Sequence, residues 1–174
     1  MKRSDSFSPQ RKFLENSHLT ALQFPEQWTQ VSVPSSKFSD GEQEGFQANF
    51  NFISGQNSAN RKIPMTSPVI LRRNGTDGWL NSFFVPASLF PAGSKVPTSP
   101  QVQVVGMNSL KVVTAEFGGF ATYEQFQTVE GNLRTALQEA GLTEVTGAFH
   151  VMYAQYDSPF TLFNRHNEVW IHVQ

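Results

Sequence analysis

The sequence predicts an α+β domain built as a pseudo-twofold repeat, in which each half has the order strand, helix, strand, strand. Two segments have apolar residues at helical spacing, and each is followed by two segments rich in the β-branched and aromatic residues typical of strands. The same order recurs at half-chain scale without sequence identity between the halves. Amphipathic helices bury their apolar faces on a sheet, so we expect an antiparallel sheet or open barrel flanked by two helices.

The first half opens with one or two strands between residues 19 and 33, interrupted by proline. The first helix is predicted to begin near Asp40, because Ser39 and Asp40 are good N-caps and Glu42 follows Ser39 at the capping-box spacing. Gly55 is the expected C-terminal stop. The helix is predicted to bury one apolar face with i, i+4, i+7 spacing, made of Phe46, Phe50 and Ile53.

Two strands are predicted after this helix, at residues 63–72 and 79–85. Two prolines interrupt the first of them, which favours an edge or bulged strand. Asn74-Gly75 between the two strands is a strong hairpin signal, since both residues tolerate positive φ. Residues 86–100 hold four prolines and are expected to form an irregular connector.

The second half repeats this order around a longer helix at about residues 122–140, which Gly141 ends. One face of this helix is expected to be buried, through Phe126, Val129, Leu133 and Leu137. Four strands are expected in this half, at residues 102–105, 111–117, 147–156 and 168–173.

Composition limits the function classes. The chain has 174 residues, which fits one domain at residues 18–174 after a flexible N-terminal tail at residues 1–17. Sixteen phenylalanines predict an aromatic core. The absence of cysteine excludes disulfides, thiolate metal sites and cysteine nucleophiles. A net charge of −1 argues against a nucleic-acid binder.

The tail is basic and serine-rich but lacks the apolar region of a secretory signal. No apolar run reaches the about 18 residues that a membrane span needs. We therefore expect a cytoplasmic protein, with targeting to an organelle by the tail left open.

Several short motifs are more specific than these patterns. They are Gly55-Gln56-Asn57, the run Lys62-Ile63-Pro64-Met65-Thr66-Ser67-Pro68-Val69, Phe83-Phe84-Val85-Pro86, Phe117-Gly118-Gly119, Tyr156-Asp157-Ser158-Pro159-Phe160 and Arg165-His166-Asn167-Glu168-Val169-Trp170. In this order and spacing they resemble the SOUL family of heme-binding proteins, over about residue 19 to the C-terminus.

The resemblance implies a distorted eight- or nine-stranded barrel flanked by two helices, and non-covalent binding of heme or a related tetrapyrrole in a shallow groove, mostly by apolar contact. The front of the chain departs from the family pattern. Gln23 stands where some members carry a histidine that is a proposed iron ligand, and glutamine is a poor ligand for iron.

A flat apolar disc with two carboxylates needs apolar walls and cations near one edge. The predicted heme-binding or porphyrin-binding residues are Phe50, Ile53, Arg61, Lys62, Ile63, Met65, Arg165 and His166. Arg61, Lys62 and Arg165 would pair with propionates, and His166 is the histidine best placed for iron, although no dedicated metal site is predicted. Each has a competing structural explanation: Phe50, Ile53 and Met65 as core, and Arg165 as the partner of Asp157 or Glu168.

The sequence contains no G-x-S-x-G, P-loop or G-x-G-x-x-G motif, so we expect no enzyme. The leading hypothesis is a tetrapyrrole carrier, buffer or sensor that binds heme or an iron-free porphyrin. The alternative is a protein–protein interaction module that keeps the fold and has lost tetrapyrrole binding. A third hypothesis, from fold analogy alone, is a sensor of small organic ligands like bacterial effector-binding domains.

Overall fold

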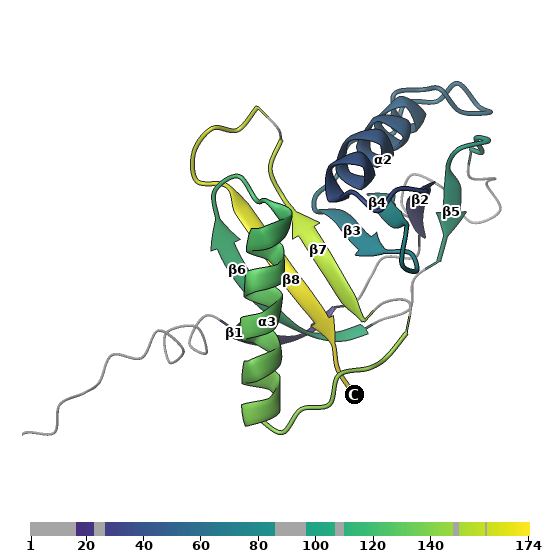
Figure 1. Ribbon diagram of the computed structural model, residues 1–174. Coiled ribbons are helices and arrows are strands. Elements are labelled where there is room, and N and C mark those ends of the chain that lie inside the picture. Colours follow the sequence, from purple (N-terminus) through teal and green to yellow (C-terminus); the bar gives the residue numbers. More distant parts are fainter. Residues whose placement is uncertain (1–16, 23–26, 86–96, 107–109, 148–149, 159) are drawn as a thin grey trace, which may run out of the picture.

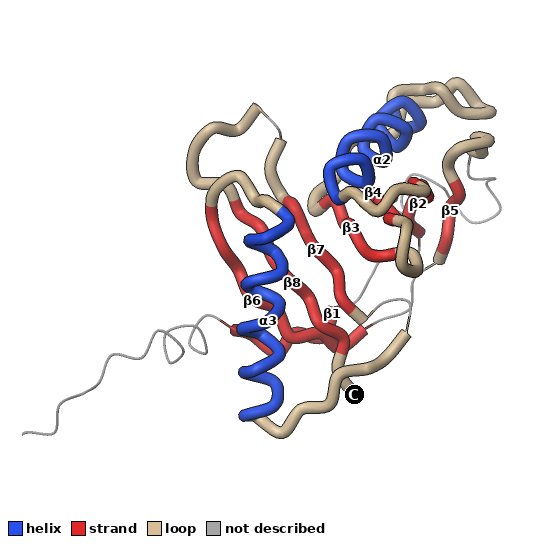
Figure 2. The backbone as a smooth tube through the Cα atoms, in the orientation of Figure 1, coloured by secondary structure: helices blue, strands red, loops and turns tan. Residues whose placement is uncertain are grey.

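The computed structural model describes residues 17–22, 27–85, 97–106, 110–147, 150–158 and 160–174, the first of these segments by its backbone alone. Two helices lie on one face of a single antiparallel sheet (Figures 1 and 2). Residues 1–16 of the predicted tail (residues 1–17) and residues 86–96 of the predicted proline-rich connector (residues 86–100) lie outside the described residues, whereas Ser17 begins a strand. The predicted α+β class is confirmed.

The elements have the following bounds, in chain order. They are β1 (Ser17–Leu22), β2 (Gln27–Val33), α2 (Phe38–Ile53), β3 (Val69–Arg73), β4 (Trp79–Val85), β5 (Gln103–Val105), β6 (Leu110–Gly118), α3 (Tyr123–Glu139), β7 (Val151–Gln155) and β8 (His166–His172).

The sheet has the strand order β1-β6-β8-β7-β3-β4-β2-β5. This order has an internal twofold symmetry. Strands β7 and β3 pair at the centre of the sheet, and in each half the third strand lies between the first and the second. The strand that precedes each half pairs with a strand of the other half. The predicted repeat is therefore confirmed. Of the described strands, β1 pairs only with β6 and β5 only with β2, so the sheet is curved but not closed into the barrel that the family resemblance implied.

Apolar side chains fill both sides of the sheet. The larger cluster packs both helices onto one face, and a smaller cluster around Trp28, Met152 and Trp170 lies on the other. Between the two helices, over the central strands, five aromatic rings contact one another with centroids 4.7–6.3 Å apart: Phe38, Trp79, Tyr123, Phe126 and Tyr153. Much of the space between the halves is therefore occupied by the protein itself.

The start of α2 differs from the prediction. The helix begins at Phe38 after Lys37, which makes no side-chain cap hydrogen bond. Asp40, predicted as an N-cap, lies in the first turn and accepts a 2.6 Å hydrogen bond from the hydroxyl of Ser35. The ring of Phe38 packs edge-on against Trp79, with a centroid distance of 5.2 Å, so burial of this ring favours a helix that starts before the predicted cap.

The buried face of α2 agrees with the prediction only in part. Phe50 is 43% exposed, whereas Gly41, Gly45 and Asn49 face the sheet. A Cβ atom at Gly41 would lie 2.5 Å from Cβ of Trp79, and one at Gly45 would lie 2.4 Å from Cβ of Asn81. Ile53 is buried and Phe46 packs on the core, as the periodicity predicted. Phe50 lies at the surface because α2 packs on β4 through its smallest residues.

The remaining elements agree well with the sequence, except that two strands start later than predicted. Strand β7 starts at Val151, whereas the prediction was residue 147. Strand β3 starts at Val69, so the predicted strand from Ile63 was wrong over its first six residues, where two prolines remove backbone donors. Helix α3 begins with a capping box, in which Thr122 and Gln125 exchange hydrogen bonds of 2.8 and 3.3 Å. Gly75 and Gly141 have a φ of +68°, as their predicted turn and C-terminal positions require.

Candidate functional site

One end of the sheet brings together the ends of four strands and the three connecting segments that adjoin them. In the strand register Val69 pairs with Gln155, Gln155 with Asn167, and Gly118 with His166. The start of β3, the end of β7, the start of β8 and the end of β6 therefore lie at the same end. The C-terminal half of α2 reaches this end as well, because Phe46 packs on Phe83, the partner of Val69, with a centroid distance of 5.2 Å.

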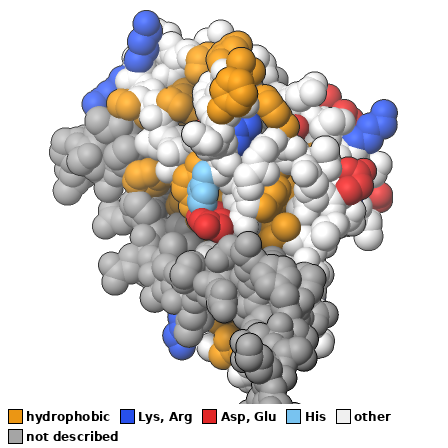
Figure 3. Space-filling model, turned by 90° about the vertical axis from the view of Figure 1, so that its left-hand side faces the viewer, with side chains coloured by type: hydrophobic (Ala, Val, Ile, Leu, Met, Phe, Trp, Pro, Cys, Tyr) orange, Lys and Arg blue, Asp and Glu red, His pale blue; other side chains and the backbone are white. Residues whose placement is uncertain are grey.

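This end carries a group of large exposed apolar side chains. Among the described residues, the exposed large hydrophobic side chains all belong to these segments, and we call them the apolar end: Phe50, Met65, Phe120, Phe160, Leu162 and Phe163. Phe160 and Phe163 are 90% and 80% exposed. Figure 3 shows hydrophobic side chains gathered at the top of the side that it views.

Asn57 shapes the loop that carries two of the predicted cations. Its side-chain amide donates to the carbonyls of Phe52 (2.8 Å) and Arg61 (2.7 Å), and its side-chain oxygen accepts from the backbone N–H groups of Ala59 and Arg61. Gly55 enters this loop with a φ of +112°, a conformation that favours glycine. The G-x-N motif is therefore a loop-forming device that presents the exposed side chains of Arg61 and Lys62.

Arg165 organises the β7–β8 loop. Its Nη1 donates to the carbonyls of Ser158 (2.8 Å) and Thr161 (3.0 Å), and its guanidinium lies 4.5 Å from the ring centroid of Phe120. The predicted alternative pairing with Asp157 or Glu168 is not found. Arg165 holds one side of the apolar end together and places a positive charge there.

His166 belongs to a polar cluster at the start of β8. Its Nε2 lies 2.6 Å from Glu168, and its Nδ1 lies 3.8 Å from Glu116. Glu168 also accepts from the hydroxyl of Tyr156 (3.0 Å) and the indole N–H of Trp170 (2.5 Å). Burial and the neighbouring Glu168 raise the pKa of Tyr156. Both ring nitrogens of His166 are thus turned toward carboxylates.

The described parts of the chain contain no group of three or more His, Cys, Asp or Glu side chains that could hold a metal ion. Within the same parts, no helix combines the length and the apolar character needed to cross a membrane.

Comparison with known proteins identifies the family of the chain. Residues 24–172 match the family model described as SOUL heme-binding protein. The chain belongs to the SOUL heme-binding protein family. The resemblance predicted from the motifs is confirmed.

Two relatives illustrate the distance within the SOUL family. Heme-binding protein 2 of Homo sapiens is 28% identical over 152 residues, which cover 84% of this chain and 73% of the relative. Heme-binding protein 1 of Xenopus laevis is 26% identical over 148 residues, 80% of this chain and 75% of that protein. The crystal structure of the EcmrR C-terminal domain has the same fold, with a TM-score of 0.69 at 10% identity, and covers 91% of this chain and 96% of that one.

The predicted site residues of this SOUL domain fall into two groups. Ile53 and Ile63 are buried, at 4% and 5% exposure, and the backbone N–H of Ile63 donates to the carbonyl of Ile53. The other six reach the surface at or near the apolar end: Phe50, Arg61, Lys62, Met65, Arg165 and His166.

Sequence reasoning missed four exposed members of the apolar end: Phe120, Phe160, Leu162 and Phe163. The sequence did contain a signal: three large apolar residues lie within four positions of an otherwise polar loop. Such a group is unusual in a loop exposed to solvent and is typical of a binding surface.

Proposed function

We propose that this SOUL domain binds heme or an iron-free porphyrin non-covalently at the apolar end, as a carrier, buffer or sensor. The observation that carries the proposal is the gathering of six exposed large hydrophobic side chains at one end of the sheet, on segments that also carry cations. A gathering of large exposed apolar side chains is typical of a binding surface on a folded domain.

The chemistry of the apolar end fits a flat macrocycle with acidic groups on one edge. Aromatic and methionine side chains offer polarisable, adaptable contact to such a disc. Arg61 and Lys62 supply exposed cations for charge-assisted hydrogen bonds to propionates, and Arg165 adds a third positive charge beside Phe120. The loop that carries Arg61 and Lys62 is anchored by Ile53 and Ile63, which are buried and joined by a backbone hydrogen bond.

The residues fit the macrocycle better than the iron. To reach iron, His166 would give up its contact with Glu168. We therefore propose that apolar and ionic contacts provide the affinity, and that the iron has no histidine ligand from the described residues. Hemin and protoporphyrin should then bind with dissociation constants within about threefold of each other.

The test is a titration of the purified chain with hemin and, separately, with iron-free protoporphyrin, followed by tryptophan quenching and by the Soret band. Saturation near one equivalent by both compounds supports the proposal. Much tighter binding of hemin would overturn the absence of an iron ligand, and no quenching by either compound would overturn tetrapyrrole binding.

The alternative is the interaction module. The exposure of Phe160 and Phe163, on a loop between two strands, is the observation that favours it. It predicts that a protein partner is recovered in a pull-down and lost when both phenylalanines are replaced by serine, with no specific quenching by porphyrins.

A further inference from the structure

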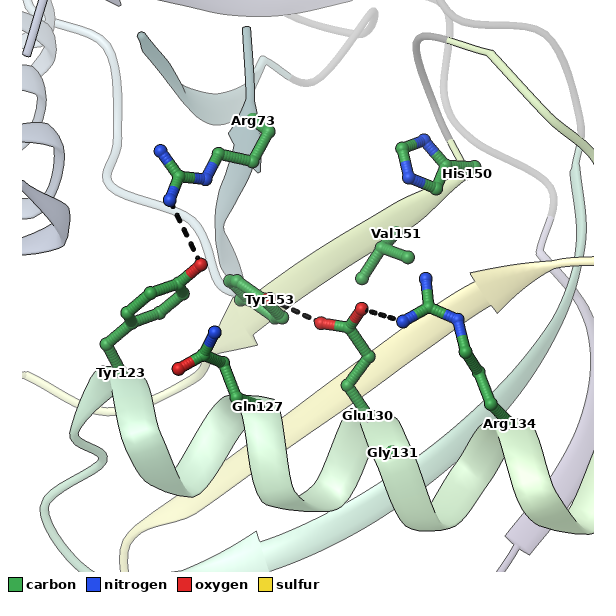
Figure 4. A pocket seen from close by; sticks show the side chains of 9 residues that line it. All are labelled: Arg73, Tyr123, Gln127, Glu130, Gly131, Arg134, His150, Val151 and Tyr153. Carbon is green, nitrogen blue, oxygen red and sulfur yellow. Dashed lines mark hydrogen bonds and ion pairs between the residues drawn. The ribbon is translucent and has the colours of Figure 1, made fainter. Parts of the chain in front are cut away.

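A cavity lies on the helical side of the sheet, between α3 and β7, and contains none of the residues assigned above to tetrapyrrole binding. It has a volume of about 270 Å³ and is lined by Arg73, Tyr123, Gln127, Glu130, Gly131, Arg134, His150, Val151 and Tyr153 (Figure 4). This volume is just below the ~300–1,000 Å³ of sites for drug-sized ligands, which suits a small ring compound rather than a tetrapyrrole.

Two of the three charged side chains that line the cavity are paired within the protein. The carboxylate of Glu130 accepts from Arg134 and, at 2.5 Å, from the hydroxyl of Tyr153. Arg134 also contacts Glu144 through two hydrogen bonds, of 3.0 and 3.1 Å. A ligand that used either charge would first have to break these contacts.

Arg73 is different. Its Nη2 donates to the hydroxyl of Tyr123 at 3.1 Å, and Nη1 donates to the carbonyls of Ser36 and Thr76 at 3.4 Å. A guanidinium has five N–H donors, so Nε–H and one Nη2–H have no acceptor in the described part of the chain. No carboxylate of the described residues lies within 4.0 Å of it, and its charge is held 4.2 Å from the ring centroid of Trp79.

Gly131 lines the same cavity from the middle of α3. Glycine disfavours a helix interior, and neither usual reason for it applies: its φ is not positive, and an added Cβ would meet no atom within 4 Å. At this position the missing side chain leaves the wall of the cavity open.

We propose that this cavity binds a small organic anion, a carboxylate on a single planar ring. The carboxylate would pair with the free donors of Arg73 in the fork geometry that guanidinium groups favour. The ring would lie against Tyr123 and Tyr153, whose centroids are 6.2 Å apart, and the exposed amide of Gln127 would serve a second polar group.

The test compares three probes of similar shape on the full chain: benzoate, benzyl alcohol and benzamidine, followed by amide chemical shifts in NMR. Benzoate is expected to shift residues of α3 and β7 and to bind most tightly. Arg73→Gln should weaken benzoate binding about tenfold or more. Gly131→Leu, which fills the cavity with a good helix former, should abolish benzoate binding, and the exposed Lys111→Gln control should leave it unchanged.

Gly131→Leu separates this site from the apolar end, because hemin affinity should be unaffected. A loss of hemin binding in this variant would overturn the independence of the two sites. Benzoate binding that survives Gly131→Leu would overturn the site itself. Preferred binding of benzamidine, lost in Glu130→Gln, would overturn its assignment to anions.

Discussion

The side-chain amide of Asn167 on β8 donates to the carbonyl oxygen of Gly119, 2.9 Å away and 48 residues earlier in the chain. The same amide lies 3.4 Å from the carbonyl of Phe117, and Asn167 is 1% exposed. Two motifs of the SOUL family, F-G-G and R-x-N-E-V-W, are thus held together by one buried side chain. Gly119 has a φ of +89°, and the turn that it forms presents Phe120 at the apolar end.

Replacing Asn167 with alanine should lower the free energy of unfolding by about 1–3 kcal/mol, because two hydrogen bonds of a buried amide, each contributing about 0.5–1.5 kcal/mol, are lost. Urea denaturation followed by circular dichroism measures this change. Gln103→Ala, at an exposed position of β5, is the control and should stay within about 0.5 kcal/mol of the parent. Equal stability of the parent and the Asn167 variant would show that the amide is not needed to hold the turn.

The same substitution, glycine to alanine, should change the free energy of unfolding in opposite directions in the two helices. Gly41→Ala should destabilise the fold by about 1–3 kcal/mol despite the better helix propensity of alanine, because the new Cβ collides with Trp79. Gly131→Ala should instead stabilise by roughly 0.5–1 kcal/mol, because its Cβ enters open space. Thermal unfolding of the two variants side by side checks the sign. Destabilisation by both would mean that α3 packs more tightly at Gly131 than the structure indicates.

Replacing both Phe160 and Phe163 with serine should weaken protoporphyrin binding about tenfold or more, because two exposed rings of the apolar end are lost without disturbing the core. Fluorescence quenching measures the affinity, and the melting temperature should hardly change. Thr161→Ala in the same loop is the matched control, since the hydrogen bonds of Thr161 with described residues of the loop use its backbone atoms. Undiminished binding by the double variant would remove the β7–β8 loop from the site.

Because of Tyr153, we expect the free energy of unfolding to fall at alkaline pH. Burial, followed by its hydrogen bond to Glu130, raises the pKa of the Tyr153 hydroxyl above the ordinary value of about 10. Its contribution is fully present below pH 10. Above that pH the unfolded chain releases the proton while the folded chain keeps it, so stability falls by up to about 1.4 kcal/mol per pH unit.

Urea denaturation of the parent and of Tyr153→Phe between pH 8 and 11 isolates this contribution. The free energies of unfolding should run parallel up to about pH 9.5, and the parent should then fall more steeply. Parallel curves over the whole range would show that Tyr153 ionises as easily in the folded protein as in the unfolded one.

Much of the architecture was readable from local signals. The end of α3 at Gly141, the turn at Gly75 and the strand Trp79–Val85 are specified by residues near one another in sequence, so propensity and turn chemistry predicted them correctly. The repeat order followed from the same signals. The motifs also identified the family, because their order and spacing are properties of the sequence itself.

The tertiary structure decided which face of each element is buried and what meets at the ends of the strands. The spacing of Phe46, Phe50 and Ile53 predicted the buried face of α2 correctly except at Phe50. The close approach of this helix to the sheet depends on Gly41 and Gly45, because a Cβ atom there would collide with Trp79 and Asn81. The apolar end and the unpaired donors of Arg73 likewise depend on strand pairing between distant segments. Periodicity along a helix or strand describes one element alone, whereas close packing depends on the shape of the partner, and that shape exists only after folding.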